Sequence, residues 1–257
     1  MRTDTRDESS LAYLIRLTST ALPGLDGRIG VPGPDQLVCG TPGNARRLAA
    51  LHEELRQHHP EAGKHYWAVR TWTLLIWQPI YLSLLAVHVA GLAPILTHLG
   101  QSVENAFVGG YSLPEHPPHQ GDESTLIQLA GKEIRTVIEA QIAELNSAGE
   151  RFIAPKLARL LAVDCVCAAL LLVQQEQALD NESLRLLEQH WLKSLAQPPV
   201  SALLTLQLDD GRECLGLDRR ACCLHFHRSD GEPCNSCPKL EQSERLKRMC
   251  KERVETC

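Results

Sequence analysis

The sequence predicts a mainly α-helical protein whose β-hairpin leads into a small, cysteine-rich C-terminal subdomain. The apolar residues make up 44% of the 257 and are mostly aliphatic, whereas aromatic residues make up only 4%. Strands would be richer in aromatic and β-branched side chains. Apolar residues also recur at helical spacing through much of the chain before residue 200. After residue 200 the sequence contains a turn signal and a cluster of cysteines. We therefore divide the chain into a mainly helical body, 1–199, and a C-terminal subdomain, 200–257.

Several helices are expected in the body, because Leu, Ile and Val recur there at spacings of three and four residues. Gly- and Pro-rich segments separate them. Pro155 suits the first turn of a helix and Asn181 suits an N-cap, while Pro198 ends the last helix. The expected elements are helix 1–20, loop 23–43, helix 44–58, loop 109–121, helix 123–146, a helix from Pro155 to about 173, and helix 181–196.

Residues 71–103 contain no Asp, Glu, Lys or Arg and are long enough for a membrane span. Pro79 and Pro94, with several polar side chains, would then lie inside the hydrocarbon. We therefore expect two buried core helices joined near Gly91 and Pro94. A membrane-embedded redox protein is kept as an alternative.

The C-terminal subdomain begins with a predicted β-hairpin. Residues 203–208 and 212–217 read as strands, and Asp209-Asp210-Gly211 supplies the turn between them. A charged helix is expected from Pro238 to Val254, directly behind the last of the clustered cysteines.

Ten cysteines are many for a chain that can build an apolar core. The first eight residues are charged and contain no apolar segment, so we expect no signal peptide and a cytoplasmic location. In a reducing compartment, clustered cysteines indicate metal or redox chemistry more often than disulfides. The cysteines should therefore be read first as ligands.

Four of the cysteines follow the pattern C-C-x10-C-x2-C, at Cys222, Cys223, Cys234 and Cys237. Adjacent side chains on an extended chain point apart, so two neighbours chelate one small ion poorly, and zinc sites usually use two C-x2-C pairs. A two-iron cluster is a wider target that a locally bent chain reaches. The spacing thus favours a 2Fe-2S cluster over zinc. His225 and His227 are read as its neighbours or as strand residues, with a mixed Cys/His site as the alternative.

This motif, with its lead-in Arg219-Arg220-Ala221, resembles the FhuF-like ferric siderophore reductases. The Trp72/Trp77-Gln78-Pro79 block is similar more loosely. The resemblance implies that all four cysteines hold a 2Fe-2S cluster, which passes one electron to siderophore-bound Fe(III), often in a hydroxamate. It also implies that reduction alone releases the iron as Fe(II), so the protein needs no catalytic acid, base or nucleophile. No flavin or nicotinamide motif is visible, so an external reductase or ferredoxin is the expected electron donor.

The charge distribution adds a physical point. The chain carries a net charge of −5, which argues against nucleic acid as a partner. Residues 219–253 contain nine Lys and Arg against five Asp and Glu, a local net charge of +4. Arg219, Arg220 and Arg228 are therefore candidates for partner docking or cluster tuning, because nearby positive charge eases reduction of an anionic cluster. The alternative is an ordinary solvated helix with i,i+4 ion pairs.

Other features are given structural interpretations. Cys165 and Cys167 are expected to pack as small apolar residues, and Cys214 as a spare ligand is only an alternative. No role is assigned to Cys250 and Cys257. The aromatic residues between 67 and 81 are expected in the core rather than as a siderophore platform. Two rival functions remain, a zinc-stabilised binding module and a non-redox siderophore-binding or biosynthesis relative. Peripheral association with the inner face of the membrane is also kept open.

Overall fold

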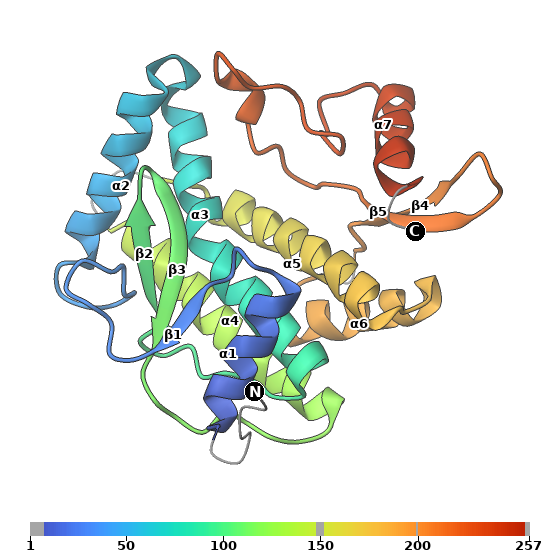
Figure 1. Cartoon of the computed structure of the whole chain (residues 1–257). Helices are drawn as coiled ribbons and strands as arrows, with labels where there is room; N and C mark the ends of the chain where they lie inside the picture. Colours follow the sequence, from blue (N-terminus) through green and yellow to red (C-terminus); the bar gives the residue numbers. More distant parts are fainter. Residues whose placement is uncertain (1–7, 148–151, 199, 255–257) are drawn as a thin grey trace, which may run out of the picture.

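The computed structural model describes residues 8–147, 152–198 and 200–254 and confirms the mainly helical class. Figure 1 shows the helices gathered around α3 and α5, a small sheet beside α2 and α3, and the C-terminal segment crossing above α5. The helices are α1 (Ser10–Ala21), α2 (Asn44–His58), α3 (Gly63–Leu85), α4 (Glu123–Leu145), α5 (Pro155–Gln177), α6 (Asn181–Ser194) and α7 (Gln242–Val254).

Most of the predicted helices are confirmed, with small shifts at their ends. α2 has the predicted bounds, and Pro155 begins α5. The N-cap of α6 is Asp180 rather than Asn181, because the Asp180 carboxylate accepts the Ser183 N–H at 2.7 Å. Residues 1–7 of the predicted first helix lie outside the described residues.

The prediction of two helices within 71–103 is wrong in its second half. The first helix continues through a π-helical turn, η3 (Ala86–Ala90), and ends at Gly91, which has φ +66°. An irregular segment and strand β2 (Gly100–Glu104) follow instead of another helix. Pro94 and a positive φ at His98 are incompatible with helix there.

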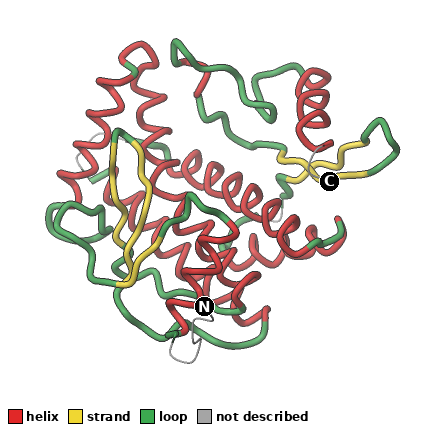
Figure 2. The backbone as a smooth tube through the Cα atoms, in the orientation of Figure 1, coloured by secondary structure: helices red, strands yellow, loops and turns green. Residues whose placement is uncertain are grey.

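A three-stranded sheet was not expected: β1 lies in the expected loop 23–43, β3 overlaps the expected loop 109–121, and β2 lies mostly in the second expected helix. β3 (Phe107–Leu113) pairs antiparallel with β2 and parallel with β1 (Gly27–Ile29), giving the order β1-β3-β2. The yellow strands at the left of Figure 2 are this sheet. Asn105 and Ala106, both at positive φ, form the turn between β2 and β3.

The core surrounds α3, whose Trp72 is fully buried and donates its indole N–H to the Ala158 carbonyl at 2.9 Å. Within the described residues, Pro60–Ala90 and α5 are long and apolar enough to cross a membrane by composition. Their most apolar windows are 67% and 56% buried in the protein. Packing in the core thus accounts for their apolar character.

Pro79 lies inside α3 and, lacking an N–H, leaves the Leu75 carbonyl without its helical partner. The amide of Gln101 on β2 donates to that carbonyl at 3.0 Å and also to Gln78 Oε1 at 3.0 Å. Gln78 in turn donates to the Gly110 carbonyl at 3.0 Å. A side chain of the sheet therefore supplies the hydrogen bond that α3 lacks at Leu75, and this contact holds the sheet against the helix.

The predicted hairpin is confirmed as β4 (Leu203–Gln207) and β5 (Glu213–Leu217). It stands apart from the first sheet and is followed by α7, which begins at Gln242. The predicted division at residues 199/200 stays a prediction.

We expect Gln101→Leu to destabilise the protein by about 1–3 kcal/mol, because it leaves the buried Leu75 carbonyl and Gln78 Oε1 without a donor. Urea unfolding followed by circular dichroism measures this. Gln128→Leu, at an exposed position of α4, is the control. Equal midpoints for the two variants would contradict the role of Gln101.

Candidate metal centre

The cysteine-rich loop runs from β5 across α5 to the N-terminal end of α3 (Figure 1). At its far end the Ser229 N–H donates to Glu61 Oε1 at 2.9 Å. Glu61 belongs to the short 3-10 helix η2 (Pro60–Ala62), just before α3. The loop is thus attached to the helical body at both of its ends.

The near end is held by Asp164, an acidic residue on the buried face of α5. Its side chain is 1% exposed, and its two oxygens accept the backbone N–H groups of Arg220 and Ala221 at 2.8 and 3.0 Å. Burial raises the pKa of Asp164 to about 6, although both hydrogen bonds act to lower it. The carboxylate therefore fixes the backbone immediately before Cys222.

The chain bends sharply after the adjacent cysteine pair. Leu224 adopts a left-handed conformation with φ +59°, and its N–H points to Cys222 Sγ at 3.4 Å. A 3-10 turn, η4 (His225–His227), follows, so of the two expectations for these histidines the one that made them strand residues is wrong. This bend supplies the local curvature that two adjacent ligands require.

A second bend returns the chain to the pair. The Gly231 N–H donates to the Arg228 carbonyl at 3.0 Å, and a Cβ at Gly231 would lie 2.1 Å from the His225 carbonyl oxygen. Only glycine fits there without a shift of the backbone. The Cys237 N–H then donates to the Cys234 carbonyl at 2.9 Å, closing a tight turn between these cysteines.

The prediction that a helix begins at Pro238 is wrong. Residues 238–241 form turns, with the Leu240 N–H on the Cys237 carbonyl at 3.1 Å, and α7 starts only at Gln242. A helix N-terminus therefore does not lie directly behind Cys237. The backbone amides near the thiols come from the turns instead.

The four thiols lie close enough to interact with one another. Cys223 interacts with Cys222 and Cys234, and Cys237 interacts with the same two residues. Hydrogen bonding from Cys234 lowers the pKa of Cys223, and the His225 N–H and the Arg219 charge act in the same direction. Among the described residues, no three or more His, Cys, Asp or Glu side chains are grouped to hold one metal ion. Four neighbouring thiols are the donor set that a 2Fe-2S cluster takes.

The three predicted docking or tuning arginines lie in different environments. Arg219 is partly buried and its Nε donates to Ser236 Oγ at 3.0 Å, inside the cysteine loop. Arg220 is exposed and donates to the Ser201 carbonyl. Arg228 forms an ion pair with Asp230, whose Oδ1 accepts its Nε–H at 2.8 Å. Their proposed roles remain predictions.

A cavity of about 630 Å³ opens beside two of the four thiols. Its lining combines polar and charged side chains from α3, α5 and the loop with an aromatic wall. The lining includes Tyr66, Arg70, Thr73, Trp77, Tyr81, Phe107, Asp164, Cys165, Arg219, Cys223, His225 and Cys234. Trp77 and Tyr81 were expected in the core; they are partly buried, pack against it and also line this cavity.

Sequence reasoning missed Arg70 and Asp164 in this lining. Arg70 is the last charged residue before the apolar block that starts at Thr71, and Asp164 is the acid within the apolar stretch of α5. A charged residue within or beside an apolar stretch can be detected in the sequence and indicates a site, because a buried charge needs a partner or a function. Phe107 lies on a strand that the sequence did not predict, so no pattern indicated it.

Of the other cysteines, Cys167 is buried and donates to Glu188 Oε1 at 3.4 Å, in line with a packing role. Cys165 is only partly buried and lines the cavity. Cys214 is buried on β5 and disulfide-bonded, so it offers no spare thiolate. Cys257 lies outside the described residues.

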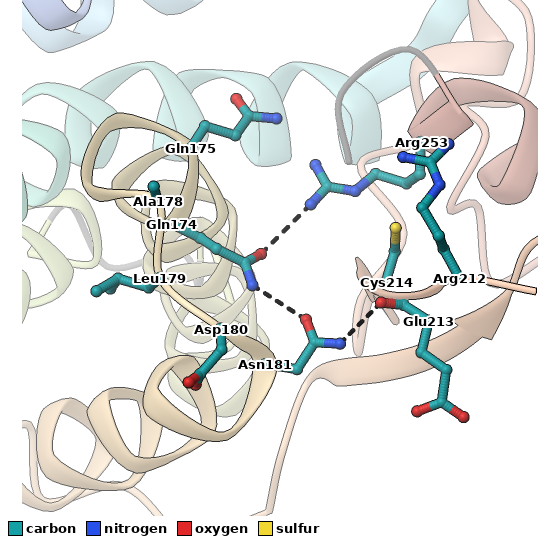
Figure 3. A pocket seen from close by; sticks show the side chains of 10 residues that line it. All are labelled: Gln174, Gln175, Ala178, Leu179, Asp180, Asn181, Arg212, Glu213, Cys214 and Arg253. Atoms are coloured by element: carbon teal, nitrogen blue, oxygen red, sulfur yellow. Dashed lines mark hydrogen bonds between the residues drawn. The ribbon is translucent and has the colours of Figure 1, made fainter.

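A second cavity, of about 510 Å³, lies between the α5–α6 turn on one side and β5 and α7 on the other (Figure 3). The Asn181 amide donates to the Glu213 carbonyl at 2.9 Å, and Gln174 donates to Asn181 Oδ1 at 3.1 Å. Arg253 of α7 donates to Gln174 Oε1 at 3.5 Å. These polar contacts hold the hairpin and α7 on the helical body.

Four cysteines are a donor set that iron–sulfur clusters use. Residues 219–239 match the family model described as the FhuF 2Fe-2S C-terminal domain. The predicted resemblance is confirmed for this segment, which contains all four cysteines. No solved structure matches the chain.

We expect Asp164→Asn to destabilise the protein by about 1–3 kcal/mol, because the amide nitrogen cannot accept one of the two loop N–H groups. Thermal unfolding of the cluster-loaded protein and iron per chain measure the effect. Asp209→Asn, in the exposed hairpin turn, is the control. An unchanged midpoint with full iron content would show that Asp164 does not hold the loop.

Cys223→Ser should abolish a stable cluster, because a serine hydroxyl is a poor substitute for a thiolate. Iron and sulfide analysis with visible absorption of anaerobically purified protein tests this. Cys250→Ser is the matched control, since Cys250 lies on α7 outside the predicted ligand set. Normal iron content in the Cys223 variant would remove that residue from the set.

Proposed function

We propose that the protein is a cytoplasmic ferric siderophore reductase that uses a 2Fe-2S cluster and an external electron donor. The observation that carries the proposal is the cavity of about 630 Å³ whose lining includes Cys223 and Cys234. Its size lies within the usual range for small-molecule sites. A ferric chelate in this cavity would lie next to two of the four thiols.

When bound, a 2Fe-2S cluster supplies one electron, which is the stoichiometry of Fe(III) reduction. Fe(III) is a hard cation gripped by anionic oxygens, and Fe(II) binds the same oxygens more weakly, so reduction alone releases the iron. No proton has to be moved by the protein. This agrees with Asp164, whose two oxygens are occupied by backbone N–H groups rather than directed at a substrate.

The chain's own contribution is to hold the chelate and exclude water. The aromatic residues of the lining supply apolar surface, and the loop supplies Arg219 and His225. A site shared by the helical body and the loop keeps the chelate close to Cys223 and Cys234. Positioning is therefore the main task of the protein residues.

An acidic ferredoxin or reductase is the proposed donor. Lys239, Lys247 and Lys251 are exposed on and just before α7, in the part of the chain with a local net charge of +4. Such a surface accelerates encounter with an acidic partner. The hydroxamate preference and the peripheral membrane association stay predictions.

Dithionite-reduced, desalted protein should be reoxidised by a ferric siderophore, because the bound Fe(III) accepts the electron and leaves as Fe(II). Anaerobic stopped-flow absorption follows the cluster, and an Fe(II)-specific chelator such as ferrozine counts the product. The Ga(III) form of the same siderophore is the control, since Ga(III) is not reduced under these conditions.

One Fe(II) per reoxidised cluster supports the proposal. A reduced cluster that survives excess ferric siderophore would favour the non-redox relative. A colourless protein that contains zinc after anaerobic purification would favour the zinc-stabilised binding module.

A further inference from the structure

The cavity beside the cysteines has an unusually aromatic wall for a chain with 4% aromatic residues. Trp77 lies 6.3 Å from Tyr81 and 6.2 Å from Phe107 between ring centroids. The Trp77 N–H is already bound to the Val108 carbonyl at 2.9 Å, so its polar edge needs no ligand. Phe107 is 47% exposed although it lines the cavity. The wall therefore offers ring surface to a ligand.

The same cavity contains two arginines, Arg70 and Arg219, that form no ion pair with a carboxylate within the described residues, although the Arg219 charge acts on Asp164 and Cys223. Arg70 is partly buried on α3, and the described part of the chain provides it with no ion-pair partner. Arg219 donates to a serine hydroxyl rather than to a carboxylate. The carboxylate in the lining, Asp164, is occupied by two backbone N–H groups. A partly desolvated guanidinium favours an anionic partner.

We propose that this cavity selects ferric chelates whose ligands are aromatic and anionic, of the catecholate type, with Phe107 and Arg70 as specificity-determining residues. This inference rests on the proposed function and names its substrate class, in place of the hydroxamate type that the resemblance predicts. Catecholate rings are flat and suit the aromatic wall. Their phenolate oxygens leave the ferric complex negatively charged, which suits Arg70. A ferric hydroxamate is aliphatic around the metal and is neutral when three hydroxamates bind, so it uses neither feature.

Arg70 also explains how an anionic chelate approaches thiolates that are themselves anionic. Cys223 lies close enough to Arg70 for their charges to interact. A cation close to two anionic groups offsets part of their repulsion. A neutral chelate would not need this. Alternatively, Arg70 offsets only the negative charge of the cluster. In that case substitution of Arg70 would change the reduction potential of the cluster and leave chelate binding unchanged.

Binding to the cluster-loaded full chain tests the inference without electron transfer, because Ga(III) replaces Fe(III) at equal charge. The probes are Ga(III) with 2,3-dihydroxybenzoate and Ga(III) with acetohydroxamate, titrated by calorimetry. We expect the catecholate complex to bind at least about tenfold more tightly, from one charged contact and ring stacking. Equal binding, or tighter binding of the hydroxamate complex, would overturn the inference.

Three variants assign the preference to residues. Arg70→Gln should weaken catecholate binding about tenfold, Arg70→Lys should restore part of it, and Phe107→Leu should weaken it about threefold. Hydroxamate binding should stay within about twofold in all three, since neither contact serves it. Arg46→Gln, at an exposed position of α2, is the matched charge control. An Arg70→Gln variant with a lower reduction potential and unchanged catecholate binding would overturn the role of Arg70.

Failure of this inference is distinguishable from failure of the proposed function. Reoxidation of the reduced protein by ferric hydroxamate, together with equal Ga(III) binding, would retain the reductase and reject the catecholate preference. Tight Ga(III)–catecholate binding with no reoxidation by either ferric complex would retain the pocket's selectivity for the ligand and reject the reductase.

Discussion

The buried carboxylate of Asp164 is the constraint on which the geometry of the site depends. It accepts two consecutive backbone N–H groups at the point where the chain leaves the hairpin for the cysteine loop. Glu188 on α6 does the same at the entrance to the hairpin, where it accepts the Ala202 N–H at 2.9 Å and the Ser201 hydroxyl at 2.7 Å. Two core helices thus hold the subdomain through carboxylates that are 1% and 2% exposed. Because a charge in such surroundings is costly unless it is hydrogen-bonded, these contacts strongly favour one position of the loop.

Much of the helical body and the matched four-cysteine segment could be predicted from the sequence, because both are local patterns. The bounds of α2 follow from its periodicity, and the hairpin follows from Asp209-Asp210-Gly211 between alternating strands. The spacing of Cys222, Cys223, Cys234 and Cys237 likewise requires a bent chain, and Leu224 and Gly231 supply the bends.

The first sheet and the cavity could not be predicted, because they depend on contacts between distant residues. β3 contains Gly109-Gly110 and reads as a loop, and it becomes a strand because β1 and β2 pair with it on either side. Pro79 reads as a helix-breaker, yet α3 continues because Gln101 replaces the missing hydrogen bond. Arg70 and Asp164 were visible only as charges within or beside apolar stretches. Nothing local showed that both would line one cavity with Cys223.

That only two of the four thiols line the cavity has a kinetic consequence for the proposed function. Cys223 and Cys234 line the cavity, whereas Cys222 is partly exposed and Cys237 is buried, and neither belongs to the lining. On the proposed function, a donor that docks away from this cavity would leave it open to a small molecule. The cluster would store the electron between its reduction by the donor and its reoxidation by the chelate, so initial-velocity plots against one substrate at several fixed concentrations of the other should run parallel. Because the two substrates would use separate surfaces, an excess of one should not inhibit competitively against the other.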